Sequence, residues 1–174
     1  VESPRMAQYD FALEDAVFVL NGAFFWPKHE LGVWLEDGVD ELELAAIFDA
    51  YTASFTHVAH TLGRTRTVTS RHGLVLVPRG RAHADLDRVV IPSGSQPTDI
   101  ADHVPTLTLD ANAYAMTTVL EDLARIDGVA TARFAAKRLE LRSPLRLEGD
   151  RIAARVVAAP IALGAMLTFV LARR

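Results

Sequence analysis

Apolar and polar positions in the first third of the chain follow two different periods. The run Leu31–Leu35 is apolar at successive positions, which predicts a strand covered on both faces, as in the centre of a parallel sheet. An acidic turn containing a glycine follows at 36–43. Apolar residues then recur at spacings of three and four, at Leu44, Ile47, Phe48 and Tyr51. Strand, glycine turn and amphipathic helix in this order predict the first half of a β-α-β crossover unit.

Further strands are predicted downstream of this helix. Residues 57–62 form a short β-like run, and 86–91 read as another buried strand. Between them, threonines alternate with other residues over 65–69, a glycine turn follows at 72–73, and an apolar run covers 74–77. Such a pattern is typical of a β-hairpin. We therefore expect an α/β domain over 31–110.

Small residues follow two of the predicted strands at their carboxyl ends. Gly38 lies in the turn after the first strand, and Ser93, Gly94 and Ser95 follow the strand at 86–91. Small side chains at this edge of a parallel sheet let a ligand or another backbone approach closely. These four residues are the candidate ligand contacts.

The segment 119–141 contains two helical stretches separated by 126–129. Gly128 permits the positive φ that a tight turn between helices needs, and Val129 and Phe134 would be apolar contacts of the second helix. We expect a helical hairpin within a region spanning 111–150.

Both ends of the chain are apolar. The segment 1–30 contains an aromatic run, Val17–Trp26, which is consistent with a buried strand, an interface or an element beside a membrane. At the other end, 151–174 contains a stretch without charge from Val156 to Ala172. That length is at the lower limit of the roughly 17–25 residues that span a bilayer. We expect 156–172 to span or lie on a membrane, with a buried core helix as the alternative.

Composition excludes several classes of protein. Half of the 174 residues are hydrophobic and 23% are charged, which is too apolar for a disordered chain. The sequence contains no cysteine, so disulfide scaffolds, thiolate zinc sites and cysteine nucleophiles are excluded. A formal charge of −4 makes the chain a poor general binder of polyanions such as nucleic acid.

Three segments, in this order, resemble the ThiJ/PfpI family of the class I glutamine amidotransferase-like superfamily. They are LGVWLEDGVDELEL at 31–44, VTSRHGLVLVP at 68–78 and LDRVVIPSGS at 86–95. They are similar to the family's first strand with its acidic helix start, its hairpin, and the strand that ends in a Pro-Gly-Gly-type loop. The resemblance implies a flavodoxin-like sandwich of helices around a mostly parallel sheet, often in a homodimer.

The chain departs from the family at the catalytic position. The resemblance implies that family enzymes carry a cysteine on a strand-to-helix elbow after the loop, hydrogen-bonded to an acidic residue at the start of the first helix. Glu43 occupies the acidic position, but the cysteine is missing. A serine would need a general base in reach. Glu43 also has a purely structural explanation, because a carboxylate three residues after Asp40 completes a capping box.

Histidines and aromatic residues give no further cofactor site. His57 and His60 are three residues apart, but on a strand they would point to opposite faces. No three ligands share a recognisable zinc spacing. We therefore expect neither a metal ion nor a cofactor.

The second predicted helix of 119–141 offers one alternative function. It carries Arg133, Lys137 and Arg138, and the pair of helices resembles the helix-turn-helix of many bacterial regulators. A plain helical hairpin has the same amphipathic pattern. Asp127 and Lys137 lie where a helix-turn-helix usually has apolar residues.

Together these patterns predict a catalytically silent ThiJ/PfpI-like domain that binds or senses a small molecule and associates with a membrane. A regulator with a helix-turn-helix at 119–141 and a fragment of a ThiJ/PfpI-like hydrolase are the alternatives. Richness in alanine and arginine indicates a bacterial source, with the protein at the membrane or in the cytoplasm.

Overall fold

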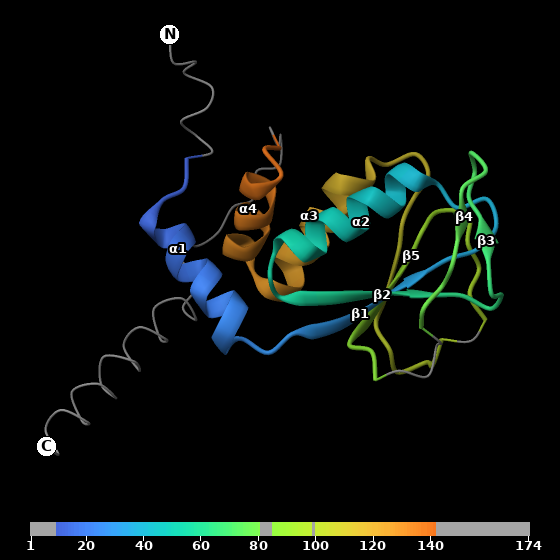
Figure 1. The fold of residues 1–174 in the computed structure, drawn as a ribbon, viewed down its shortest axis with the longest axis horizontal. Coiled ribbons are helices and arrows are strands. Elements are labelled where there is room, and N and C mark those ends of the chain that lie inside the picture. The colour runs from blue at the N-terminus through green and yellow to red at the C-terminus, as the bar shows by residue number, and fades with distance from the viewer. Residues whose placement is uncertain (1–9, 81–84, 99, 142–174) are drawn as a thin grey trace, which may run out of the picture.

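A computed structural model describes residues 10–80, 85–98 and 100–141 of the chain. Its centre is a parallel sheet of four strands in the order β2-β1-β5-β6, beside a separate antiparallel hairpin of β3 and β4 (Figure 1). The strands are β1 (His29–Trp34), β2 (His57–Leu62), β3 (Val68–Thr69), β4 (Val75–Leu76), β5 (Arg88–Ile91) and β6 (Thr106–Thr108). The expected α/β class with a mostly parallel sheet is confirmed.

Five helical elements accompany these strands in the described part of the chain. They are α1 (Leu13–Leu20), the π-helical turn η2 (Asn21–Phe25), α2 (Glu41–Ala53), α3 (Ala115–Asp127) and α4 (Val129–Arg138). Gly128 separates α3 from α4 with φ of +92°, the conformation that the sequence predicted for this turn. The structure thus has two consecutive helices in the region predicted as a helical hairpin, of which residues 142–150 lie outside the described part.

Alternate residues of the sheet face two different cores. Leu31 and Val33 of β1 and Val90 of β5 face α2, α3 and α4, and all three side chains are completely buried. Trp34 and Val89 face the opposite side, where the described cover consists of loop residues such as Leu86, Ile100 and Val104. Within the described residues, helices therefore cover one face of the sheet and loops cover the other.

The amino-terminal segment packs outside the helical layer. Phe18 of α1 stacks on Phe134 of α4 with ring centroids 4.2 Å apart, and its edge meets Trp26 at 4.9 Å. Lys137 of α4 also pairs with the buried Asp15. Of the interpretations of 17–26, the buried strand is wrong, because α1 and η2 are helical and pack on α4 instead of joining the sheet.

Two expectations concern the far end of the chain. The apolar stretch 156–172, with the whole of 151–174, lies outside the described residues. Among the residues that are described, no helix is long and apolar enough to cross a bilayer.

Candidate functional site

The candidate site lies where β1 and β5 end side by side at the carboxyl edge of the sheet. α2 begins just beyond β1, and its first turn is fixed by Asp40. One carboxylate oxygen of Asp40 accepts hydrogen bonds from the N–H of Leu42 at 2.8 Å and from that of Glu43 at 3.4 Å. The bond from Leu42 is the main reason that the pKa of Asp40 is lowered. This cap orients Glu43 toward the loop after β5.

Glu43 binds Ser93 with both carboxylate oxygens. The Ser93 N–H donates to Oε2 at 2.7 Å, and the Ser93 hydroxyl donates to Oε1 at 2.5 Å. The capping-box interpretation of Glu43 is therefore wrong, although Asp40 caps the helix as predicted. Glu43 crosses to the neighbouring loop because a backbone N–H and a hydroxyl are both presented to it there.

The other three candidate ligand contacts lie in the turns at this edge. Gly94 has φ of +77° and Gly38 has φ of +87°, so each turn needs a left-handed residue. The N–H of Ser95 closes the loop by donating to the Pro92 carbonyl at 3.3 Å, and the N–H of Gly38 donates to the Thr69 carbonyl at 2.8 Å. The bond of Gly38 therefore holds the β1–α2 turn against β3. Gly38 has its partner on the hairpin, not on the loop that carries Ser93.

Four carboxylates of the β1–α2 segment fix the loops around Glu43. Glu36 accepts from the Gln96 N–H at 2.9 Å, and Asp37 accepts from the Thr69 N–H at 2.7 Å. Asp40 pairs with Arg71 of the hairpin turn at 2.9 Å. These contacts were not predicted, because they depend on the fold and not on sequence spacing.

Glu41 is the fourth of these carboxylates, and it binds the hairpin turn most extensively. It accepts from the Ser70 hydroxyl, and from the His72 backbone at 2.9 Å and its Nδ1 at 2.6 Å. These hydrogen bonds, led by that of Ser70, lower the pKa of Glu41 to about 2. The hairpin is therefore tied to the first turn of α2 beside the site.

The comparisons with known proteins concern the fold. No protein-family model and no curated protein sequence matches the chain. A ThiJ/PfpI family protein from Pseudomonas syringae is similar in structure, with a TM-score of 0.55, 13% identity, and 90% of this chain and 92% of that chain covered. DJ-1beta from Drosophila melanogaster has a TM-score of 0.53, with 12% identity and coverage of 67% and 100%. The fold is ThiJ/PfpI-like.

An AraC family transcriptional regulator from Pseudomonas putida is also similar, with a TM-score of 0.52, 14% identity, and coverage of 64% of this chain and 99% of that chain. At these identities the similarity concerns the fold alone. This structural similarity agrees with the sequence resemblance at 31–95. It gives no information on activity, which depends on the residues of the site.

The described part of the carboxyl edge has no nucleophile elbow between β6 and α3. A nucleophile elbow is a sharp, strained turn between a strand and a helix. Here β6 leads into α3 through 109–114, and none of these residues has positive φ. Glu43 and Ser93 bring together a carboxylate and a hydroxyl, while the nearby His72 is bound to Glu41 on the hairpin. Glu41 does bring the Ser70 hydroxyl and the His72 ring together on the hairpin, but that hydroxyl donates to the carboxylate, whereas in a Ser-His-Asp triad it donates to the imidazole.

The basic residues of the predicted recognition helix have partners within the chain. Lys137 pairs with Asp15, and Arg138 donates to the Ala53 carbonyl at 2.8 Å and lies 4.2 Å from the centre of the Phe55 ring. Arg133 is half-buried. α4 is therefore a packed element of the domain, which weighs against a free helix in a DNA groove.

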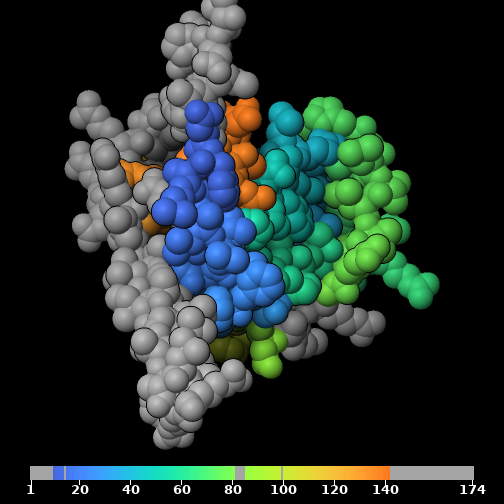
Figure 2. Space-filling view, turned by 60° about the vertical axis from the view of Figure 1, so that its left-hand side comes forward, coloured from blue at the N-terminus to red at the C-terminus, as the bar shows by residue number. Residues whose placement is uncertain are grey.

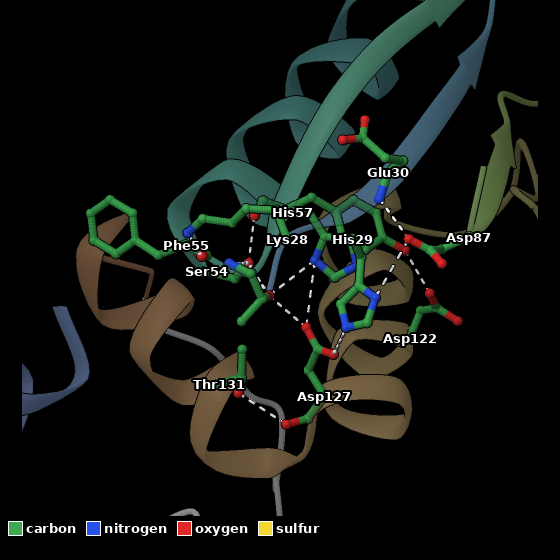
Figure 3. Close-up of polar contacts among 12 residues, drawn as sticks. Lys28, His29, Glu30, Ser54, Phe55, His57, Asp87, Asp122, Asp127 and Thr131 are labelled. Carbon is green, nitrogen blue, oxygen red and sulfur yellow. Dashed lines mark hydrogen bonds and ion pairs between the residues drawn. The ribbon is translucent and has the colours of Figure 1, made fainter. Parts of the chain in front are cut away.

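A second polar cluster lies at the opposite, amino edge of the sheet, and the sequence analysis missed it (Figure 3). His29 and His57 begin β1 and β2 in register, and both point toward Asp127 at the end of α3. The nitrogen–oxygen distances are 3.8 Å from His29 and 3.5 Å from His57. Burial lowers the pKa of His57 to about 4, while the Asp127 charge opposes that shift.

The expected separation of His57 from His60 is confirmed, because His57 is buried whereas His60 is exposed on β2 and pairs with Glu30. In the described part of the chain, no three histidine, aspartate or glutamate side chains are arranged to hold a metal ion. The paired register of the first residues of β1 and β2 is the signal that could have revealed His29 beside His57.

A buried ion pair lies beside this cluster. The Asp122 carboxylate accepts from the Tyr51 hydroxyl and from Arg88, each at 2.5 Å, and also from Arg125. Burial and the Asp122 charge raise the pKa of Tyr51 far above its usual value, so the phenol remains a donor. Through these bonds, Asp122 of α3 is connected to Tyr51 of α2 and to Arg88 of β5.

Proposed function

We propose that this chain is a catalytically silent ThiJ/PfpI-like module that binds or senses a small molecule at the carboxyl edge of its sheet. The observation that carries the proposal is the double hydrogen bond from Ser93 to Glu43. The acidic residue that the family resemblance places beside a cysteine nucleophile is here held by a loop serine. Both of its oxygens are occupied by a structural contact.

The position of this edge supports binding. Ligands of open α/β sheets bind in the crevice outside the carboxyl ends of the strands. Loops meet there from β1, from β5 and from the hairpin, and they are held in place by Glu36, Asp37, Asp40 and Glu41. Because these groups are acidic, the edge favours a neutral polar or cationic ligand over an anion.

Ligand binding is tested by thermal unfolding of the full chain with a panel of amino acids and small primary amines. A ligand that binds the folded state raises the midpoint of unfolding. We expect at least one compound to do so, and we expect Glu43→Gln to remove that shift. Glu121→Gln, an exposed glutamate of α3, is the matched control and should keep it. A shift that survives in Glu43→Gln would place the ligand elsewhere.

Membrane association is the second part of the proposal. It rests on the uncharged sequence of 156–172, for which exposure to water would be unfavourable. Co-sedimentation of the full chain with phosphatidylcholine vesicles tests it. We expect the chain in the pellet, and a chain that stays in the supernatant would make 156–172 a core helix.

A homodimer, as the resemblance implies, is checked by light scattering in the same buffer.

A further inference from the structure

Large apolar side chains are exposed along one side of the amino-terminal segment. Leu13 is 83% exposed, Leu20 54% and Phe24 76%. Leu13, Val17 and Leu20 are spaced by four and three residues, so they share one side of α1. We call the exposed set, Phe11, Leu13, Leu20, Phe24 and Phe25, the α1 surface. Figure 2 shows α1 as a ridge on this face of the molecule, beside α4.

The opposite side of α1 is fixed by packing, so the exposed side is a defined surface of the fold. Phe18 is buried against Phe134, and Asp15 is buried with Lys137. Beyond α1, the Lys28 ammonium donates to the carbonyls of Gly22 and Phe55 and so holds the first turn of η2 against the α2–β2 loop. α1 therefore cannot turn its leucines inward without breaking these contacts.

Charged residues are confined to the start of this segment, at Glu14 and Asp15. Residues 16–27 contain no Asp, Glu, Lys or Arg. Apolar patches of this kind on a folded domain mark contact with a partner or a membrane. Leucine and phenylalanine form the lipid-facing side of helices that lie in a membrane interface; the other side of such helices usually carries Lys or Arg, whereas the charged residues of α1 are Glu14 and Asp15.

The chain also leaves the described part of the structure next to this surface. α4 packs against α1, and the description ends at Leu141, three residues after α4. Leu141 is therefore the last described residue before 142–174, the part of the sequence that includes the uncharged stretch 156–172.

We infer that the α1 surface lies on the same lipid bilayer that 156–172 enters, so that α1 and η2 form the membrane-facing side of the folded domain. This inference rests on the proposed membrane association. A bilayer fits better than coverage of α1 by 156–172 in water. Because 156–172 carries no charge, a helix formed by it would be apolar on all sides, and docking one side on α1 would leave the other side exposed. Lipid covers both elements at once.

The absence of native cysteine allows a direct test on the full chain. Phe24→Cys and Val75→Cys each introduce one exposed site, the first on the α1 surface and the second on the hairpin strand β4 as a matched control. Each variant is labelled with an environment-sensitive fluorophore and mixed with phosphatidylcholine vesicles, with and without brominated lipid. A Leu13→Cys label provides a second position on the α1 surface.

We expect the labels at positions 24 and 13 to shift to shorter emission wavelength on vesicles and to lose most of their emission with brominated lipid. The label at position 75 should do neither. If the chain sediments with vesicles while the labels on the α1 surface stay unquenched, the inference is wrong and membrane association stands. If the chain does not sediment, membrane association fails and the inference fails with it. A label at position 24 that is already shifted without lipid would show that protein covers the α1 surface.

Discussion

Glu43, in the first turn of α2, binds Ser93, in the loop after β5, although the two residues are 50 apart in the sequence. The Ser93 N–H lies 2.7 Å from Oε2 of Glu43, and the Ser93 hydroxyl lies 2.5 Å from Oε1. Each oxygen has its own donor, so the pair fixes the start of α2 against the end of β5. In a ThiJ/PfpI-like fold this is the position where the family resemblance places the catalytic carboxylate.

Ser93→Ala removes the hydroxyl and keeps the backbone N–H. We expect it to lower the free energy of unfolding by about 1.5 kcal/mol, because hydrogen bonds to charged groups contribute roughly 1.5–3 kcal/mol and this one is only partly buried. Urea unfolding followed by circular dichroism measures the change. Ser95→Ala, two residues along the same loop, is the control and should change stability by a few tenths of a kcal/mol at most. Equal effects of the two changes would show that the hydroxyl of Ser93 has no special role.

His57 predicts how stability depends on pH. Its pKa falls from 6.5 to about 4 on folding because the ring is buried, so the unfolded chain takes up the proton first as pH falls. The free energy of unfolding is therefore complete above pH 6.5 and decreases toward pH 4, by about 3 kcal/mol over the window. Glu41 acts at lower pH, since its pKa moves from 4.5 to about 2.

Denaturant unfolding between pH 4.5 and 6.5 covers the range in which the lowered pKa of His57 acts. His57→Asn should flatten the pH dependence in this range, whatever its effect on absolute stability. His103→Gln, a change at an exposed histidine, should leave the slope intact. A slope that persists in His57→Asn would assign it to other groups.

Among the variants considered, replacement of Asp122 is expected to cause the largest loss of stability. Its side chain is 1% exposed and accepts hydrogen bonds from Tyr51 and Arg88. Removing one partner of a buried pair leaves the other charge uncompensated, so Asp122→Ala should cost about 3–5 kcal/mol. Thermal and urea unfolding measure the loss, and Asp102→Ala at an exposed position serves as the control. A loss below about 1 kcal/mol, the usual value for a surface pair, would mean that Arg88 finds water instead.

Arg138 tests the alternative of a DNA-binding regulator. Arg138→Ala removes the bond to the Ala53 carbonyl and the contact with the Phe55 ring, so we expect a stability loss of about 1–2 kcal/mol. We expect no sequence-specific DNA binding by either protein. Gel-shift selection from random duplexes checks this, and recovery of a palindromic consensus that Arg138→Ala weakens would favour the regulator.

Most of the central sheet could be predicted from local pattern. β1, β2 and β5 are short apolar or β-branched runs bounded by turns, and α2 has its cap at Asp40 as expected. The amino-terminal aromatic run could not be assigned in this way. A helix with Phe18 packed inward and Leu20 outward is apolar on both sides, so its periodicity is weak.

The sequence predicted which residues belong to the candidate site, but it did not predict which of them contact one another. Glu43 and Ser93 were both identified, but local spacing favoured a capping box for Glu43 over the acidic position of the family. Its actual partner depends on β1 and β5 being neighbours, which is long-range information. For the same reason, the contacts of His29 and His57 with Asp127 could not be predicted from the sequence. Residues 142–174, which carry the membrane prediction, lie outside the described structure.

The most direct test of the central claim is product formation by the purified full chain with the substrates of thiol-based relatives: a reactive aldehyde, a glycated peptide and an unmodified peptide. Catalytic silence predicts no turnover above buffer, and the same result for Glu43→Gln, because Glu43 is bound by Ser93 and no thiolate is present. Turnover by the native chain that is lost in Glu43→Gln would contradict the account and would reveal a nucleophile other than cysteine.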